Sequence, residues 1–366
     1  MALLAVCVGF VVYPLTERGD DVINSDWPAF ATGARLLVTD PGHLYDIGVQ
    51  RRVELDVTGG RTLVTLGIQG ILPFVGPAWV AVAAVPFEQL GTELGGRLWI
   101  LFGLACLAAG LLLAVRPRPP SAVLPAFASV PTALLLLNAQ LDGLVVLGAG
   151  AAMALWSRPY LAGLALGLTL MKPQLMLPLG AALILSRRWK VLLGWAGAGT
   201  VLWAVPALLN PHWVLDWLPA LNGPVQPGSR EIDLAHFGTA FPAGWRLPAV
   251  AGLSLIGLGA VLALAYRVRS DMRAAAAVIL AGGALVAPHA LPTDMVLVAA
   301  ALAVWGRAQW HDWLVLSVGA LVCALTPAPF PAVVGVLVIG WICLRAAGSG
   351  ASTGSRRPLE PAASSG

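Results

Sequence analysis

Side chains able to do acid–base or ionic chemistry are few in this sequence, because only 11% of its 366 residues are charged. The candidates, each beside an apolar run, are Asp26, Gln140, Lys172, His289 and Asp294. A carboxylate can accept a proton, and an imidazole or an ammonium group can bind a phosphate. Charged groups are costly to place in so apolar a chain and tend to be functional. We therefore take these residues as the candidate site.

Several candidates also have a structural explanation. Ser25 or Asp26 can cap the helix that Pro28 would start, and Asp294 can cap the apolar run that follows it. His289 lies between two prolines at the end of an apolar run, where it can contact a phosphate, transfer a proton or be a buried, hydrogen-bonded histidine. Both kinds of explanation stay open for these residues.

The remaining candidates lie within or between apolar runs. Lys172 precedes Pro173 and can extend its ammonium group toward the membrane surface, or can be a cation that faces a phosphate. Gln140 and Asp142 can form the polar tip of a hairpin or part of a ligand site. The sequence alone does not decide between these alternatives.

Other well-known kinds of site are absent from the sequence. It contains no phosphate-binding loop and no nucleophile elbow. The acids and histidine of the second polar segment, Asp216, Glu231, Asp233 and His236, have no metal-ligand spacing. The 4 cysteines lie inside apolar runs and are expected to be small buried side chains. We predict neither a metal nor a cofactor.

The composition predicts a membrane protein. Apolar residues make up 58% of the chain and mean hydropathy is +0.82, whereas a soluble domain carries about 25% charged residues. Apolar runs occur along nearly the whole chain, and a membrane-spanning helix needs about 20 residues. We therefore expect an all-α, polytopic bundle of about 10–13 transmembrane helices in the cell membrane.

We expect one membrane domain over residues 1–347, followed by a disordered cytoplasmic tail over 348–366. Polar segments at 16–70 and 210–244 are too long for simple turns, and long loops often carry function. The first apolar run, 2–15, is short for a span and lacks signal-peptide features. The true start is therefore expected upstream, or this helix is short at its cytoplasmic end.

Basic clusters predict the orientation. Lys and Arg beside membrane spans favour the cytoplasm, which places 116–120, 186–190, 267–273 and 307–311 inside. Both long loops and all the candidate residues then lie on the extracytoplasmic side. This topology requires the proline-containing run 71–90 to enter the membrane without crossing it, although a full span stays open. The net charge of +4 thus reflects topology, and we expect no nucleic acid partner.

The order of several short motifs resembles one known family. The motifs are Leu44-Tyr45-Asp46, Asn138-Ala139-Gln140, Met171-Lys172-Pro173-Gln174 and Pro288-His289 ahead of Asp294. From about residue 20 to 300 the chain resembles the bacterial polyprenyl-phosphate-mannose-dependent mannosyltransferases, glycosyltransferase family 87, of the GT-C superfamily. The resemblance implies a GT-C-like membrane enzyme that takes a sugar from a polyprenyl phosphate donor at the outer face and passes it to an envelope glycolipid or glycan.

The resemblance also implies roles for the candidates. Asp26 matches the essential acid of the first outer loop, Lys172 matches the Lys-Pro segment, and His289 and Asp294 match the late outer loop. One carboxylate suffices for an inverting displacement on a glycosyl phosphate, because it needs only to take the proton of the acceptor hydroxyl. Lys172 and a protonated His289 would then stabilise the departing phosphate, and Gln140 belongs to the same binding site.

Some alternatives remain open. A transporter or flippase of lipid-linked saccharides would also have many spans and few intramembrane charges. An inactive protein of the same fold is a further alternative, because Val75-Gly76-Pro77 stands where the family often has Tyr-Pro-Pro. The sugar, mannose or arabinose, and the acceptor are not fixed by the sequence.

Overall fold

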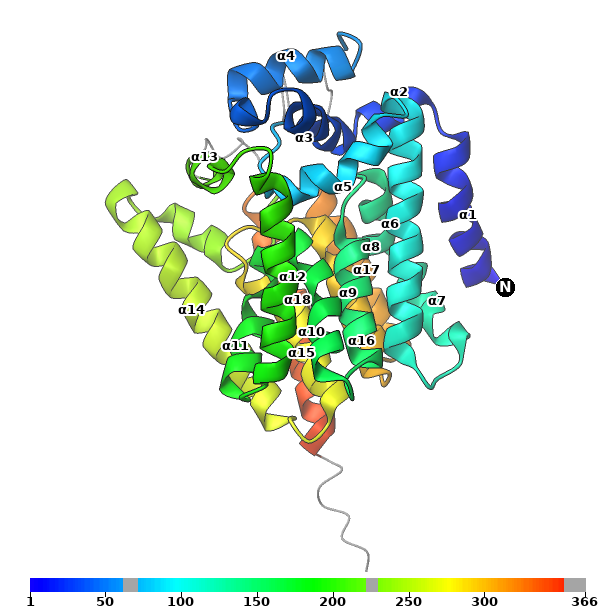
Figure 1. Ribbon diagram of the computed structural model, residues 1–366. Coiled ribbons are helices and arrows are strands. Elements are labelled where there is room, and N and C mark those ends of the chain that lie inside the picture. Colours follow the sequence, from blue (N-terminus) through cyan, green and yellow to red (C-terminus); the bar gives the residue numbers. More distant parts are fainter. Residues whose placement is uncertain (62–71, 222–229, 352–366) are drawn as a thin grey trace, which may run out of the picture.

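The computed structural model describes residues 1–61, 72–221 and 230–351, and these form helices joined by turns, with no strand among them. The helices of the first loop stand above a helical bundle (Figure 1). The first part of the chain contains α1 (Ala2–Thr16), α2 (Gly19–Ile23), α3 (Trp27–Thr39), η1 (Pro41–His43), α4 (Ile47–Val57) and α5 (Ala78–Glu88).

The rest of the described chain forms the bundle and the second loop. Its elements are α6 (Thr92–Val115), η2 (Pro120–Val123), α7 (Leu124–Phe127), α8 (Val130–Leu137), α9 (Asp142–Ala154), α10 (Pro159–Leu166), η3 (Gly167–Met171), η4 (Pro173–Met176), α11 (Leu177–Leu185), α12 (Trp189–Ala207), α13 (Trp213–Ala220), η5 (Ala235–Ala240), α14 (Ala243–Arg267), α15 (Met272–Val286), η6 (Pro292–Asp294), α16 (Met295–Trp305), α17 (Trp310–Leu325) and α18 (Phe330–Ala351).

The chain is an all-α, polytopic membrane protein, as expected. In the described ranges, 4 helices are long and apolar enough to span a membrane, namely α6, α12, α14 and α18 over Phe330–Gly348. A bent pair formed by 120–127 and 130–137 would make 5. The expected number of about 10–13 spans was based on apolar runs. Many of these runs form apolar helices of only 10–17 residues.

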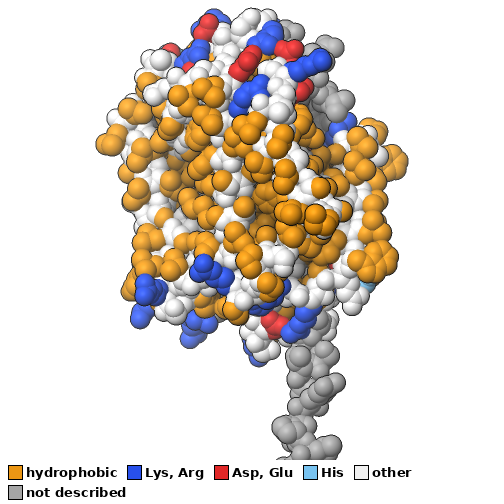
Figure 2. Space-filling view, turned by 90° about the vertical axis from the view of Figure 1, so that its right-hand side faces the viewer, with side chains coloured by type: hydrophobic (Ala, Val, Ile, Leu, Met, Phe, Trp, Pro, Cys, Tyr) orange, Lys and Arg blue, Asp and Glu red, His pale blue; other side chains and the backbone are white. Residues whose placement is uncertain are grey.

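The surface agrees with a lipid environment. Figure 2 shows a wide hydrophobic belt between two charged ends, with Lys and Arg gathered at the lower end and both charge signs at the upper end. Large apolar side chains of α12 and α14 also face outward, among them Leu193, Val201 and Ile256, which are 61%, 63% and 71% exposed. In water this surface would be unfavourable, whereas lipid solvates it.

The described part of the run 71–90, residues 72–90, begins and ends beside the first-loop helices. The Gln50 side chain of α4 pairs with the backbone of Phe74, donating to its carbonyl at 3.0 Å and accepting from its N–H at 2.8 Å. At the other end of the run, Glu88 accepts a bond from Arg35 of α3 at 2.7 Å. Both ends of the run are thus held by first-loop helices, and α5 is too short to count as a span by length alone.

The two long loops contact each other. The Asn210 side chain donates to the carbonyl of Pro41 at 3.0 Å, which joins the two loops directly. The Trp217 indole donates to the carbonyl of Val75, in the run that follows the first loop, at 2.9 Å. The loops therefore lie on one side of the bundle, as the expected topology requires. Residues 348–351 of the expected tail continue α18, whereas the rest of that tail lies outside the described residues.

Helices α6 and α9 pack backbone to backbone, which positions the start of α9 at the candidate site. A Cβ at Gly143 would overlap the carbonyl oxygen of Gly103, and a Cβ at Gly150 would overlap that of Gly110. Small residues allow such close helix contacts in membranes. Gly143 directly follows Asp142, so this contact also sets the position of the Asp142 carboxylate.

Gly143→Ala and Gly150→Ala should each destabilise the protein by about 1–3 kcal/mol, because the added methyl group forces α6 and α9 apart. Thermal unfolding of the detergent-solubilised protein measures this effect as a lower Tm. Gly252→Ala and Gly259→Ala in α14 are matched controls, since a Cβ there meets nothing within 4 Å. Equal Tm values for all four variants would contradict this account of the packing.

Candidate active site

Asp26 lies immediately before α3, but its carboxylate does not cap that helix. The Ser25 hydroxyl instead accepts the N–H of Trp27 at 3.2 Å. The Asp26 carboxylate accepts a hydrogen bond from the Gln140 side chain, and the Asp26 N–H donates to the carbonyl of Asn138 at 3.3 Å. Capping therefore does not explain Asp26, and two of the candidates meet although they are far apart in sequence.

The turn that presents Gln140 has a constrained backbone. Ala139 has φ +52°, a left-handed conformation that is unusual for a residue with a side chain. The Trp99 indole donates to the Ala139 carbonyl at 2.9 Å, and the Gln140 N–H donates to the carbonyl of Leu135 at 3.0 Å. These bonds hold the turn in the conformation that directs Gln140 to Asp26.

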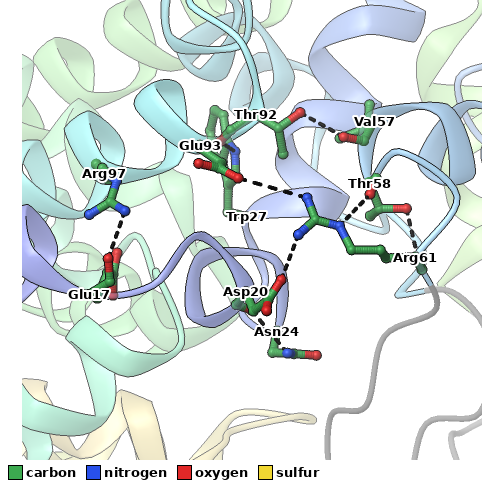
Figure 3. Close-up of polar contacts among 10 residues, drawn as sticks. All are labelled: Glu17, Asp20, Asn24, Trp27, Val57, Thr58, Arg61, Thr92, Glu93 and Arg97. Atoms are coloured by element: carbon green, nitrogen blue, oxygen red, sulfur yellow. Dashed lines mark hydrogen bonds and ion pairs between the residues drawn. The ribbon is translucent and has the colours of Figure 1, made fainter.

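The residue next to Asp26 is anchored to the top of α6 (Figure 3). The Trp27 indole donates to the Thr92 carbonyl at 2.7 Å, and the Thr92 hydroxyl donates to the Val57 carbonyl at 2.6 Å. Arg61 adds ion pairs to Asp20 at 2.6 Å and to Glu93 at 3.9 Å. The start of α3 is therefore tied directly to α6, and α6 is tied in turn to the end of α4, which supports the position of Asp26.

Lys172 lies in the break between η3 and η4 and is bound by two carboxylates. Its Nζ is 2.8 Å from Asp142 Oδ2 and 2.5 Å from Asp294 Oδ1. The side chains of Lys172, Asp142 and Asp294 are 13%, 0% and 4% exposed. Lys172 thus does not extend to the membrane surface, and its charge is balanced inside the protein. We call these three residues the buried ion cluster.

Asp294 forms the turn ahead of α16 without capping that helix. Its Oδ2 accepts the N–H of Leu291 at 2.6 Å while Oδ1 binds Lys172. The Asp294 side chain therefore does not cap α16, but it closes a capping box at the start of η6, which leads directly into α16. This arrangement fixes the chain just after His289.

His289 is bound by Glu231, an acid that was not among the candidates expected from the sequence. Its Nδ1 is 3.0 Å from Oε1 of Glu231, and Nδ1 of His236 is 2.9 Å from Oε2 of the same carboxylate. The side chain of His289 is 53% exposed, whereas that of Glu231 is only 9% exposed. The signal in the sequence was a short Glu231-x-Asp233-x-x-His236 group at the end of the second long loop.

The match to one protein family comes from the central part of the chain. The model of glycosyltransferase family 87 matches residues 74–292, which is more than half of the sequence. This chain belongs to glycosyltransferase family 87. No curated protein and no solved structure matches it.

Family 87 membership confirms the expected family and makes the chain a membrane glycosyltransferase, which uses a sugar donor and an acceptor. The matched region contains Gln140, Lys172 and His289, whereas Asp26 lies before it and Asp294 just after it. The evidence for Asp26 and Asp294, which lie outside the matched region, is therefore the set of contacts described above.

The surroundings of the candidate groups shift their pKa values in different directions. Burial raises the pKa of Asp26 to about 6, against the hydrogen bond from Gln140 and the charge of Lys172. Burial would also raise the pKa of Glu231, but the hydrogen bonds from His289 and His236 outweigh it and lower that pKa to about 2. Burial would lower the pKa of His289, but the bond to Glu231 and its charge raise it.

The charges also connect the two parts of the site. Besides burial and the Gln140 bond, the charge of Lys172 lowers the pKa of Asp26 and the charge of Asp294 raises it. Besides burial and Glu231, the charge of Asp294 raises the pKa of His289. Asp26, the buried ion cluster and His289 therefore share one electrostatic environment. Within the described ranges, no group of three His, Cys, Asp or Glu side chains is arranged to hold a metal ion.

Lys172→Met should destabilise the protein by about 3–5 kcal/mol, because it leaves Asp142 and Asp294 buried together without their cation. A lower Tm in detergent measures the loss. Lys190→Met is the matched control, since Lys190 is exposed at the far end of the bundle. If both variants unfolded at the wild-type temperature, the buried ion cluster would not hold the bundle together as described.

Proposed function

We propose that this family 87 enzyme transfers a mannosyl or related residue from a polyprenyl phosphate donor to an envelope glycolipid or glycan. The observation that carries the proposal is the Asp26 carboxylate, which is held by Gln140 and does not cap α3. A carboxylate kept in place without a helix-capping role is suited to act as a general base. Family membership favours this enzyme over the transporter considered above.

In the proposed reaction, an acceptor hydroxyl attacks the anomeric carbon of the donor sugar. Its proton moves to Asp26 as the new C–O bond forms, and the bond from the anomeric carbon to the phosphate oxygen breaks. The configuration inverts in this single displacement, and polyprenyl phosphate leaves. With a pKa raised to about 6, Asp26 is mostly ionised at neutral pH and still binds a proton more strongly than an ordinary aspartate.

The phosphate contact is assigned to His289. Its side chain is half exposed, and its raised pKa favours the cationic form, so it can stabilise the negative charge that develops on the leaving group. Lys172 is paired with two acids, so we assign it an indirect role: its charge favours the ionised form of Asp26. Gln140 orients the base, and Asp294 supports the turn that follows His289.

We further propose that the site faces the extracytoplasmic side. The two long loops contact each other at the site end of the bundle, whereas Lys and Arg gather at the opposite end (Figure 2). Basic residues at one membrane border favour the cytoplasm. A polyprenyl donor fits this arrangement, because its tail can stay in lipid while its phosphate reaches the loops.

Asp26→Asn should lower transfer on the order of 10²–10⁴-fold, because it removes the base and keeps the size of the side chain. The assay follows transfer from polyprenyl-phosphate mannose to endogenous acceptors in membranes. Asp21→Asn is the matched control, since Asp21 is an exposed acid of the same loop. Full activity of Asp26→Asn would remove the proposed base.

The pH profile should show an acid limb near pH 6. Asp26 acts in its ionised form and its pKa is raised to about 6, so activity is present above this pH and is lost as the pH falls through it. Initial rates between pH 4.5 and 8 at saturating donor test this expectation. A profile that stayed flat down to pH 4.5 would show that the base is not a carboxylate with a raised pKa.

A further inference from the structure

Glu231 bridges two histidines, one from its own loop and one from the late turn. Its Oε2 binds Nδ1 of His236 at 2.9 Å, and its Oε1 binds Nδ1 of His289 at 3.0 Å. The carboxylate is 9% exposed, so it is removed from most of the water that would otherwise screen it. A carboxylate bound to Nδ1 fixes the ring orientation and leaves Nε2 as the nitrogen for a ligand.

The backbone around this carboxylate is fixed as well. The Ile232 N–H donates to the carbonyl of Ala290 at 2.9 Å, and the Ala290 N–H donates to Asp233 at 2.8 Å. Asp233 also accepts the N–H of His236 at 3.0 Å. These bonds fix the end of the second loop against the turn that contains His289. The contact between Glu231 and His289 is therefore supported by the backbone on both sides.

We propose that Glu231 is a positioning residue of this enzyme: it orients the His289 ring and holds it in the protonated form, so that Nε2 donates to the phosphate of the donor. The phosphate part of this inference rests on the proposed function. The donor phosphate carries one negative charge while it is esterified to the sugar and gains a second when it leaves. A cation already oriented toward it stabilises this increase without rearrangement.

The charged groups around His289 agree with this role. Glu231, Asp233 and Asp294 all contribute negative charge to its surroundings, with Glu231 the only one that contacts the ring. His236 faces the same carboxylate from the other side. Removal of the Glu231 charge should therefore lower the pKa of His289 more than removal of Asp233 or Asp294.

Reaction of His289 with diethyl pyrocarbonate tests the first part of the proposal without any sugar transfer. The reagent acylates the neutral imidazole, so the rate rises as the ring loses its proton. In Glu231→Gln, His289 should react roughly threefold faster or more at pH 6.5 than in the wild type. Mass spectrometry of the His289 peptide measures the rate, and exposed His212 in the same sample normalises the reagent.

His236→Gln is the matched control, because it leaves Glu231 on His289. Its His289 should react with a pH profile close to that of the wild type. Identical profiles for Glu231→Gln and the wild type, or an equal change in both variants, would overturn the proposal. Glu231→Asp, which keeps the charge on a shorter side chain, should give an intermediate rate, and this separates loss of charge from loss of folding.

The transfer assay tests the second part. If His289 acts in its protonated form, the pH profile also has an alkaline limb where that proton is lost. Glu231→Gln should move this alkaline limb to lower pH, because His289 then loses its proton earlier, whereas a purely structural role would scale the rate equally at every pH. If no transfer is found for the wild type while the His289 reactivity changes as expected, the proposed function fails and the positioning role of Glu231 stands.

Discussion

A lysine ammonium held between two carboxylates inside an apolar bundle is the interaction on which the site depends. Lys172, Asp142 and Asp294 come from separate helical segments, and their side chains are almost fully buried. Removing such charges from water is costly unless each is paired, so the segments that carry them must come together. The cluster thereby joins the start of α9, the break before η4 and the turn before α16 into one support for the residues around it.

The buried ion cluster lies between two groups of candidate residues. On one side Gln140, two residues before Asp142, binds Asp26. On the other side, the turn formed by Asp294 and Leu291 follows His289. The pKa of the Asp26 carboxyl is raised, so it binds a proton more strongly than an ordinary aspartate. The pKa of the partly exposed His289 imidazole is raised as well, which favours its charged form. A base held by the Gln140 amide and a cation held by the Glu231 carboxylate are what displacement at a glycosyl phosphate needs.

Composition was enough to predict an all-helical membrane protein, and scarcity of ionisable groups was enough to make Asp26, Lys172 and His289 candidates, with Gln140 as a polar residue between apolar runs. Their partners could not be predicted, because Lys172 binds acids that are 30 and 122 residues away, and ion pairing at such separation depends on tertiary packing. Glu231 was missed for the same reason, since its contact with His289 spans 58 residues. Hydropathy does not show where an apolar run bends or breaks, so it could not predict that many of the runs form apolar helices of only 10–17 residues.

A structure of the Asp26→Asn enzyme with polyprenyl-phosphate mannose bound would show whether Asp26 and His289 meet at one donor molecule. We expect the phosphate to contact His289 and the anomeric carbon to lie beside residue 26, with the prenyl chain leading into the hydrophobic belt. A donor bound at the basic end of the bundle, or a phosphate far from His289, would contradict this expectation.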